Sequence, residues 1–133
     1  MNKQCENNSC DFLVGLGDNF YEYGVTDEDD RRFRGTYENI YGKTSSRNNI
    51  KDLNFYHIAG NHDHRGNATA QIIYTKTKDT NFYLPSFWYS FTIEKGADLT
   101  MTFMMIDTNI MKGSGDTNNL PDSDVYDYRG VLK

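Results

Sequence analysis

The first half of the chain contains one uninterrupted apolar run and one further strand-like run. The first run, residues 12–16, is followed by Gly17-Asp18-Asn19, and the second, residues 54–59, by Gly60-Asn61-His62. Runs of this length that stop at glycine and asparagine predict buried strands that end in turns. Each strand is therefore expected to deliver a glycine and then polar side chains to its carboxyl end.

A helix over about residues 27–41 is predicted between these two strands. Thr26 and the acids after it form a capping pattern, Phe33 and Tyr37 recur at helical spacing, and Gly42 follows. Strand, helix and strand joined in this way form a βαβ unit, whose strands are parallel. Because the carboxyl ends of parallel strands meet at one edge, Asp18 and Asn61 are expected to become neighbours.

The second half of the chain predicts a short helix and then a hairpin. The helix covers residues 68–75, and apolar and polar residues alternate over residues 87–93. After a turn at residues 94–98, the Met- and Phe-rich run 99–106 predicts a second, buried strand of the hairpin. Glycine, asparagine and aspartate dominate beyond Asp107, which predicts irregular chain there. The predicted fold class is α/β.

Composition narrows the range of functions. The chain has 133 residues with a net charge of −5, and 14 Lys and Arg against 19 Asp and Glu leave no basic surplus for nucleic-acid binding. No apolar run reaches the ~18 residues of a membrane-spanning helix, and residues 1–6 lack the apolar stretch of a signal peptide. One soluble domain, or part of one, is expected, and the oligomeric state is left open.

Two further features leave alternatives open. Cys5 and Cys10 are read as incidental thiols or as one small surface disulfide, because two cysteines at this spacing make a poor zinc pair. His57 lies inside the second strand and is read as a satisfied or partly exposed strand residue. Aromatic residues make up 14% of a chain whose mean hydropathy is only −0.77, so something other than bulk hydrophobicity is expected to organise the core.

Two polar clusters at the strand ends carry the candidate chemistry, and they resemble a known family. Gly17-Asp18-Asn19-Phe20-Tyr21 and Gly60-Asn61-His62-Asp63 are similar to two signature blocks of the calcineurin-like metallophosphoesterases. A Tyr three places after the Asp is typical of the purple acid phosphatases. The resemblance to their small, tartrate-resistant type covers about residues 10–108, with 109–133 as a tail. It implies part of a two-sheet α/β sandwich.

The resemblance implies a dinuclear metal centre, Fe(III) beside Fe(II) or Zn(II), that hydrolyses phosphate monoesters, including phosphoproteins, at acidic pH. Asp18 would bridge both ions, Tyr21 would bind the ferric ion, and Asn61 the divalent ion. His62 would face the phosphate as the catalytic histidine. A hard trivalent ion favours carboxylate and phenolate oxygens, and the neutral oxygen of Asn61 suits an ion of lower charge.

Further roles follow from the same resemblance. His64 is expected to stand behind the metal ligands or to face substrate, and Asn67 of the sequon Asn67-Ala68-Thr69 to be glycosylated. Secretion or lysosomal targeting is implied as well. A full member of the family also needs an Asp from an earlier strand and later histidines, but no His follows His64 in this sequence. The metal centre is therefore expected to be incomplete and the isolated chain inactive.

Three hypotheses follow from this incomplete ligand set. In the first, the chain is an incomplete piece of an acid phosphatase. In the second, it is a short, catalytically inactive relative that serves as a binding or interaction protein. In the third, it is a weak mononuclear metal binder with another activity. The intact motifs around Asp18 and Asn61 favour the first.

Overall fold

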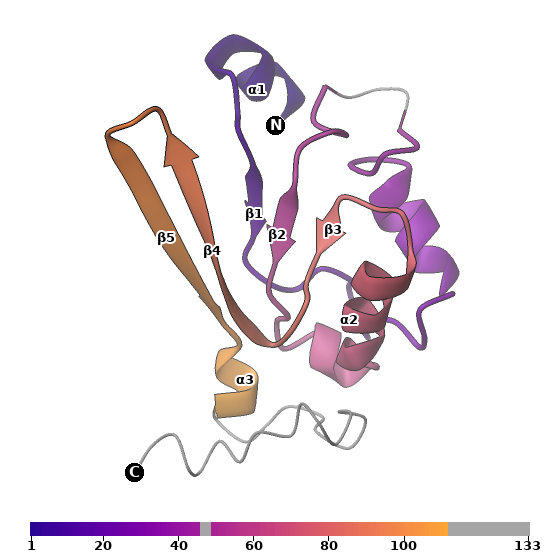
Figure 1. Cartoon of the computed structure of the whole chain (residues 1–133). Helices are drawn as coiled ribbons and strands as arrows, with labels where there is room; N and C mark the ends of the chain where they lie inside the picture. Colours follow the sequence, from indigo (N-terminus) through magenta and orange to yellow (C-terminus); the bar gives the residue numbers. More distant parts are fainter. Residues whose placement is uncertain (46–48, 112–133) are drawn as a thin grey trace, which may run out of the picture.

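A computed structural model of the chain describes residues 1–45 and 49–111 (Figure 1). Its central sheet has three parallel strands in the order β1 (Leu13–Gly15), β2 (Phe55–His57) and β3 (Phe82–Tyr83). An antiparallel hairpin follows, made of β4 (Trp88–Lys95) and β5 (Leu99–Ile106). The predicted parallel pairing of the first two strands and the predicted hairpin are both confirmed.

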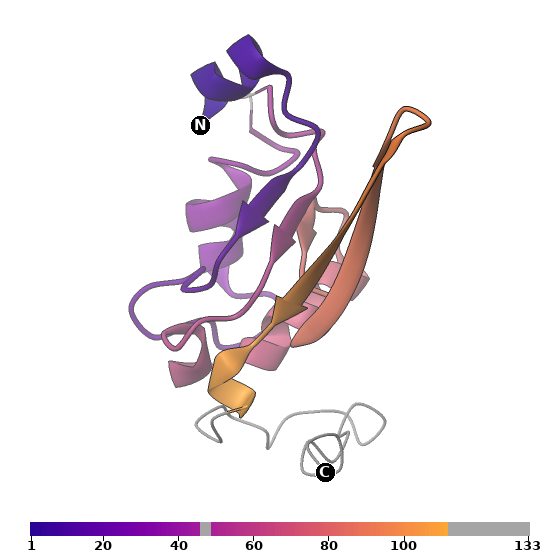
Figure 2. The same ribbon diagram turned by 90° about the vertical axis from the view of Figure 1, so that its left-hand side faces the viewer.

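Short helical segments connect and flank these strands. They are α1 (Asn2–Asn8), the π-helical η1 (Phe33–Glu38), the 3-10 turn η2 (Asp63–Arg65), α2 (Ala68–Thr77) and α3 (Thr108–Met111). The hairpin lies on one side of the three-stranded sheet, and η1 and α2 lie on the other (Figures 1 and 2). The result is a layered α/β arrangement, which confirms the predicted fold class.

The helix predicted over residues 27–41 begins later than expected. The carboxylate of Asp30 accepts hydrogen bonds from the amides of Thr26 and Arg32, at 3.0 and 2.9 Å. These bonds hold residues 26–32 in a turn ahead of η1 (Phe33–Glu38), whose own N-cap residue, Arg32, makes no side-chain capping hydrogen bond. The prediction was correct for the buried face, where Phe33 and Tyr37 are 2% and 5% exposed.

Two elements escaped the sequence analysis, and one prediction was wrong in part. The two-residue β3 and the N-terminal α1 are too short to give a periodic signal. The segment predicted to be irregular begins with the helical turn α3, which the Asp107 side chain caps by accepting from the amide of Asn109 at 2.8 Å. The remainder of that segment, residues 112–133, lies outside the described residues.

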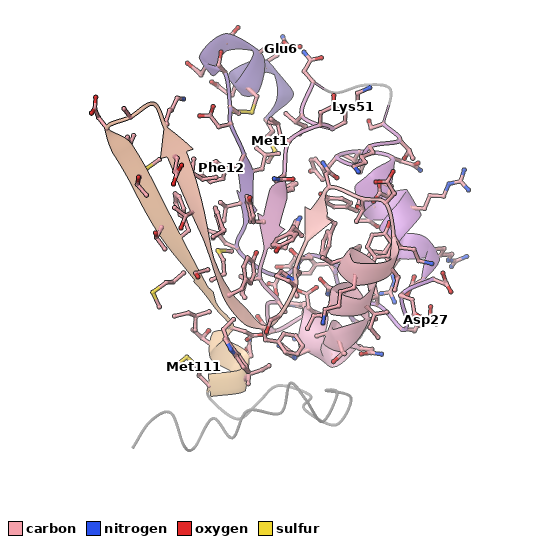
Figure 3. All side chains as sticks on the ribbon, viewed as in Figure 1. Met1, Glu6, Phe12, Asp27, Lys51 and Met111 are labelled. Atoms are coloured by element: carbon pink, nitrogen blue, oxygen red, sulfur yellow. A yellow bond between two sulfur atoms is a disulfide. The ribbon has the colours of Figure 1, made fainter. Side chains whose placement is uncertain are left out.

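Aromatic rings pack throughout the core. Phe33 stacks on Tyr74 with a centroid distance of 3.8 Å, on the side of the sheet that carries η1 and α2. On the hairpin side Tyr56 stacks on Phe91 at 3.6 Å, and Phe12 lies edge-on to Phe91 at 5.7 Å (Figure 3). The rings of Phe12, which precedes β1, of Tyr56 in β2 and of Phe91 in the hairpin thus bridge the two sheets.

Burial of the strands is less complete than predicted. Met105 is the one buried residue of β5, whereas Met104 and Ile106 are 73% and 45% exposed, because the described elements leave the outer face of the hairpin uncovered. Leu16 was expected inside a buried strand but is 86% exposed, since β1 ends at Gly15. The prediction that the run 99–106 is buried was therefore wrong for most of its residues.

Cys5 and Cys10 form a disulfide, the second of the two alternatives that the sequence left open. Cys5 belongs to the hydrophobic core, so the bond fastens α1 to the body of the fold. Among the described residues no helix combines the length and the apolar character needed to span a bilayer.

Candidate functional site

The loops that follow β1 and β2 meet through their glycines. A Cβ on Gly17 would lie 2.9 Å from the Cα of Gly60, and a Cβ on Gly60 would lie 2.3 Å from the Asp18 nitrogen. Gly17 also has a φ of +94°, which glycine adopts at little cost. Both glycines are therefore needed for the two motif loops to lie against each other at the carboxyl edge of the sheet.

Asp18 stands where the two loops meet. Its backbone is left-handed, with a φ of +53°, a conformation that costs about 1 kcal/mol or more in a residue other than glycine. Its Oδ1 accepts a hydrogen bond from the His62 amide at 3.0 Å, and its Oδ2 accepts one from the Tyr21 hydroxyl at 2.7 Å. Partial burial pushes the pKa of Asp18 upward, but these two hydrogen bonds together with the nearby positive charges of His62 and Arg65 hold that pKa below its usual value.

Tyr21 and His62 present their rings side by side above this carboxylate. Their centroids are 4.4 Å apart, and Tyr21 is 64% exposed. The hydrogen bond to Asp18 raises the pKa of the Tyr21 hydroxyl, because it stabilises the neutral phenol. His62 Nδ1 lies 2.8 Å from the carbonyl oxygen of Glu22. Since a carbonyl only accepts, Nδ1 carries a proton and Nε2 is the nitrogen left for other partners.

Asn61 lies on the turn between Gly60 and His62, and its side chain is exposed. The structure thus brings Asp18, Tyr21 and His62 into contact and places Asn61 beside them on the adjoining turn. The expectation that the ends of β1 and β2 become neighbours holds, because the two strands pair in parallel up to Gly15 and His57.

Asp63 anchors both loops, a role that the sequence analysis missed. It is fully buried and accepts hydrogen bonds from the amides of Asn19, Phe20 and Gly60, at 3.0, 3.1 and 2.8 Å. The side-chain amide of Gln71 on α2 supplies a fourth, at 2.9 Å. An acid three residues after the turn glycine was a usable signal, because Asp side chains commonly accept from nearby amides in turns.

His57 is a buried strand residue, but it is only partly satisfied, because its Nε2 has no hydrogen-bond partner among the described residues. Asn19 donates through Nδ2 to the carbonyl of Ile58 and to Gln71, so its Oδ1 accepts from His57 Nδ1 at 3.0 Å. Burial lowers the pKa of His57 to about 3, and its ring stacks on Phe82 at 4.1 Å. His57 therefore supports the loop of Asp18 from below as a neutral imidazole.

His64 is placed away from the other candidates. Its side chain is 3% exposed, and its Nε2 lies 2.5 Å from Oδ2 of the fully buried Asp107. In this structure His64 does not reach the surface that Tyr21 and His62 present, so contact with substrate is not supported for it. The alternative expectation, a position behind the site, agrees with its burial.

Asn67 begins α2. Its side-chain oxygen accepts from the Ala70 amide at 3.2 Å, and Thr69 of the sequon is 3% exposed. A helix cap explains this asparagine without a glycan, so its glycosylation stays a prediction.

The donors at this edge fit part of a metal site. Asp18 Oδ2 and the Tyr21 oxygen, 2.7 Å apart, form the carboxylate and phenol pair that a hard cation prefers once the phenol has lost its proton. Within residues 1–45 and 49–111 no three His, Cys, Asp or Glu side chains gather closely enough to hold a metal ion. The described chain therefore offers a partial ligand set.

Comparison with solved structures supports the class that the fold and the site define. The structure of "GAP50 the anchor in the inner membrane complex of Plasmodium" matches with a TM-score of 0.71 over 95% of this chain and 39% of that chain. At 22% sequence identity this likeness concerns the fold alone. The parallel sheet and the hairpin define a layered α/β protein that shares this fold.

Sequence comparison gives the family. The chain is 40% identical over 107 residues to the rat tartrate-resistant acid phosphatase type 5 and 39% identical to the human protein. It is 32% identical over 123 residues to purple acid phosphatase 7 of Arabidopsis thaliana. These relatives are acid phosphatases by name, and this chain is homologous to the purple acid phosphatases over the part that they share.

The match covers only part of the relatives. It takes in 80% of this chain but 31% of the rat protein, so the chain spans about a third of the length of these relatives. No protein-family model matches the chain.

Proposed function

We propose that this chain supplies part of the active site of an acid phosphatase that hydrolyses phosphate monoesters. The observation that carries the proposal is the contact of Asp18 with both Tyr21 and the His62 amide at the carboxyl edge of the sheet. The names of the homologous proteins agree with this reaction. Substrates would be small phosphate monoesters or phosphoproteins.

In this proposal the chain contributes three ligands to a dinuclear centre of Fe(III) with Fe(II) or Zn(II). Asp18 offers two carboxylate oxygens, Tyr21 a phenolate after loss of its proton, and Asn61 an exposed amide oxygen. When bound, such a metal pair activates water and neutralises charge on the phosphoryl oxygens. The remaining metal ligands would come from polypeptide outside the segment that this chain shares with its relatives.

His62 is the proposed group that acts on the phosphate. Its Nδ1–H is engaged by the Glu22 carbonyl, which fixes the ring beside Tyr21. Nε2 then donates a hydrogen bond only when the ring is an imidazolium. His62 would therefore donate to a phosphate oxygen, or to the departing alkoxide, as the protonated ring.

A secretory or lysosomal route is part of the same proposal. The disulfide between Cys5 and Cys10 supports it, because such bonds persist in oxidising compartments. Glycosylation of Asn67 would fit that route.

The experiment is a chimera in which residues 10–108 replace the matching segment of the rat relative. We expect a visible tyrosinate-to-iron band and hydrolysis of an aryl phosphate. Tyr21→Phe should abolish the band, and Tyr23→Phe, which alters an equally exposed tyrosine two residues away, should leave it unchanged. A chimera that folds but shows neither band nor turnover would contradict the proposal. The 133-residue chain by itself is expected to show neither.

The second candidate is an inactive interaction protein. The exposed apolar side chains of Leu16 and Met104, 86% and 73% accessible, favour it, since large apolar groups on a surface often mark contact sites. An inactive, folded chimera together with self-association of the isolated chain would favour this candidate over the phosphatase.

A further inference from the structure

His64 and Asp107 form a buried polar pair that lies outside the exposed candidate site. The His64 Nε2 is 2.5 Å from Asp107 Oδ2, and the two side chains are 3% and 0% exposed. A carboxylate oxygen accepts, so Nε2 donates, and His64 Nδ1 is then a buried acceptor with no hydrogen-bond partner among the described residues. The pair therefore depends on a single contact.

The pair joins the motif turn to the hairpin. His64 belongs to η2, directly after the turn that carries Asn61 and His62, and its own amide donates to the Gly60 carbonyl at 3.3 Å. Asp107 follows β5, and its amide donates to the carbonyl of Phe87 at 2.9 Å. The ring of Phe87 lies 5.3 Å from the His64 ring. The hydrogen bond between His64 and Asp107 thus ties η2 to the end of the hairpin, in addition to the bond that Tyr89 of β4 donates to the carbonyl of His57 in β2 at 2.7 Å.

The side chain of Asp107 also caps α3. Its Oδ1 accepts from the amides of Asn109 and Ile110, at 2.8 and 3.3 Å, and so begins α3. Each oxygen of this buried carboxylate is therefore satisfied by a different element: Oδ2 by the motif turn and Oδ1 by α3. Loss of the His64 donor would leave one oxygen of a buried charge unpaired, which is costly.

We propose that His64 and Asp107 are positioning residues that fix the turn bearing Asn61 and His62 relative to the hairpin. The neighbouring Asp63 binds the same turn to the loop of Asp18, so two consecutive residues fasten it to two different parts of the fold. The roles of Asn61 and His62 toward a ligand rest on the proposed function. The fastening itself follows from the contacts alone.

The test compares two variants of the full 133-residue chain by amide hydrogen exchange. His64→Gln places a side-chain donor near the position of Nε2, whereas His64→Asn is one methylene shorter and cannot reach Asp107. We expect at least tenfold faster exchange in His64→Asn at the amides of His62, Asn109 and Ile110. In His64→Gln these rates should stay within about threefold of the parent.

A reference amide separates positioning from general stability. The amide of Ile58 donates to the carbonyl of Gly15 between β1 and β2, away from the pair. Its exchange should be unchanged in both variants. An equal rise at Ile58, unfolding of His64→Asn, or no change at His62 would each overturn the proposal.

A second measurement distinguishes this proposal from the proposed function. Mn²⁺ added to the parent chain should broaden the amide signals of Asp18 and His62 if this edge binds cations, and the broadening should weaken in His64→Asn. Absence of broadening in the parent would count against the metal site but not against the fastening. Equal broadening in the parent and in His64→Asn would count against the positioning role.

Discussion

The main-chain amide of His62 donates to Oδ1 of Asp18 at 3.0 Å, across 44 positions of sequence. This bond joins the two motif loops directly, and it exists because Gly60 lets the second loop lie against the first. The exposed imidazole and phenol rings are consequently held over one carboxylate before any ligand is present. Preorganisation of this kind is what a binding site requires.

Gly60→Ala should push the two loops apart. The added Cβ would lie 2.3 Å from both the nitrogen and Oδ1 of Asp18, which forces backbone to move. We expect a loss of about 1–3 kcal/mol in the free energy of unfolding by urea, together with faster exchange of the His62 amide. Gly35→Ala is the control, because nothing lies within 4 Å of that position in η1. The control should be neutral or slightly stabilising, and equal losses in both variants would refute the steric argument.

Asp63→Asn should destabilise the fold more than any change at an exposed acid. Together the two carboxylate oxygens of Asp63 accept hydrogen bonds from three backbone amides and from Gln71. The substitution replaces one of these oxygens with an amino group, which donates, so buried donors lose their acceptor. We expect a cost of about 2–4 kcal/mol in urea unfolding. Asp79→Asn is the matched control, since Asp79 is 89% exposed and its ion pair with Lys43 is worth under about 1 kcal/mol. Similar midpoints for both variants would show that Asp63 is not an anchor.

The parts of the fold set by local pattern were predictable. The apolar runs ahead of Gly17 and Gly60 located β1 and β2, and period-two alternation located the hairpin. The start of η1 was not predictable, because Thr26 and Asp30 both resemble helix caps in the sequence, and only the folded structure shows that they close a turn ahead of η1. The exposure of the outer hairpin face was also missed, since side-chain chemistry alone does not tell which strand face is covered.

In the candidate site, too, the contacts between neighbours in sequence were predictable and the contacts between distant residues were not. Tyr21 and Asp18 are three positions apart in the sequence, so their contact follows from the motif. The partner of His64, by contrast, lies 43 positions away on another element. A motif places neighbouring histidines together in sequence but does not say which of them points inward. His62 points to the surface loop and His64 to the interior because η2 turns the chain between them.

Asn67→Asp should separate the two roles of that residue. Aspartate can still accept from the Ala70 amide and cap α2, although the 3.3 Å bond from Nδ2 to the Thr26 carbonyl is lost. We expect a change of under about 1 kcal/mol in stability, against about 1 kcal/mol or more for Asn67→Ala. In chain expressed through a secretory host, a glycosidase should lower the mass of the parent by one glycan more than that of Asn67→Asp, which keeps the second sequon Asn7-Asn8-Ser9. An unchanged parent mass would remove the glycosylation prediction and leave the cap.

His57 should make the fold sensitive to acid. Burial lowers its pKa from 6.5 to about 3, so between these values the unfolded chain binds a proton that the folded chain excludes. Stability is then complete above about pH 6.5 and falls as the pH drops toward 3, by up to about 1.4 kcal/mol per pH unit. His57→Asn keeps a donor for Asn19 but does not titrate. Its free energy of unfolding in urea should be lower at neutral pH, because the Phe82 stacking is lost, yet should fall less steeply between about pH 6.5 and 4.5. Parallel pH curves for the parent and the variant would mean that other groups, such as Asp30 with its lowered pKa, account for the acid sensitivity.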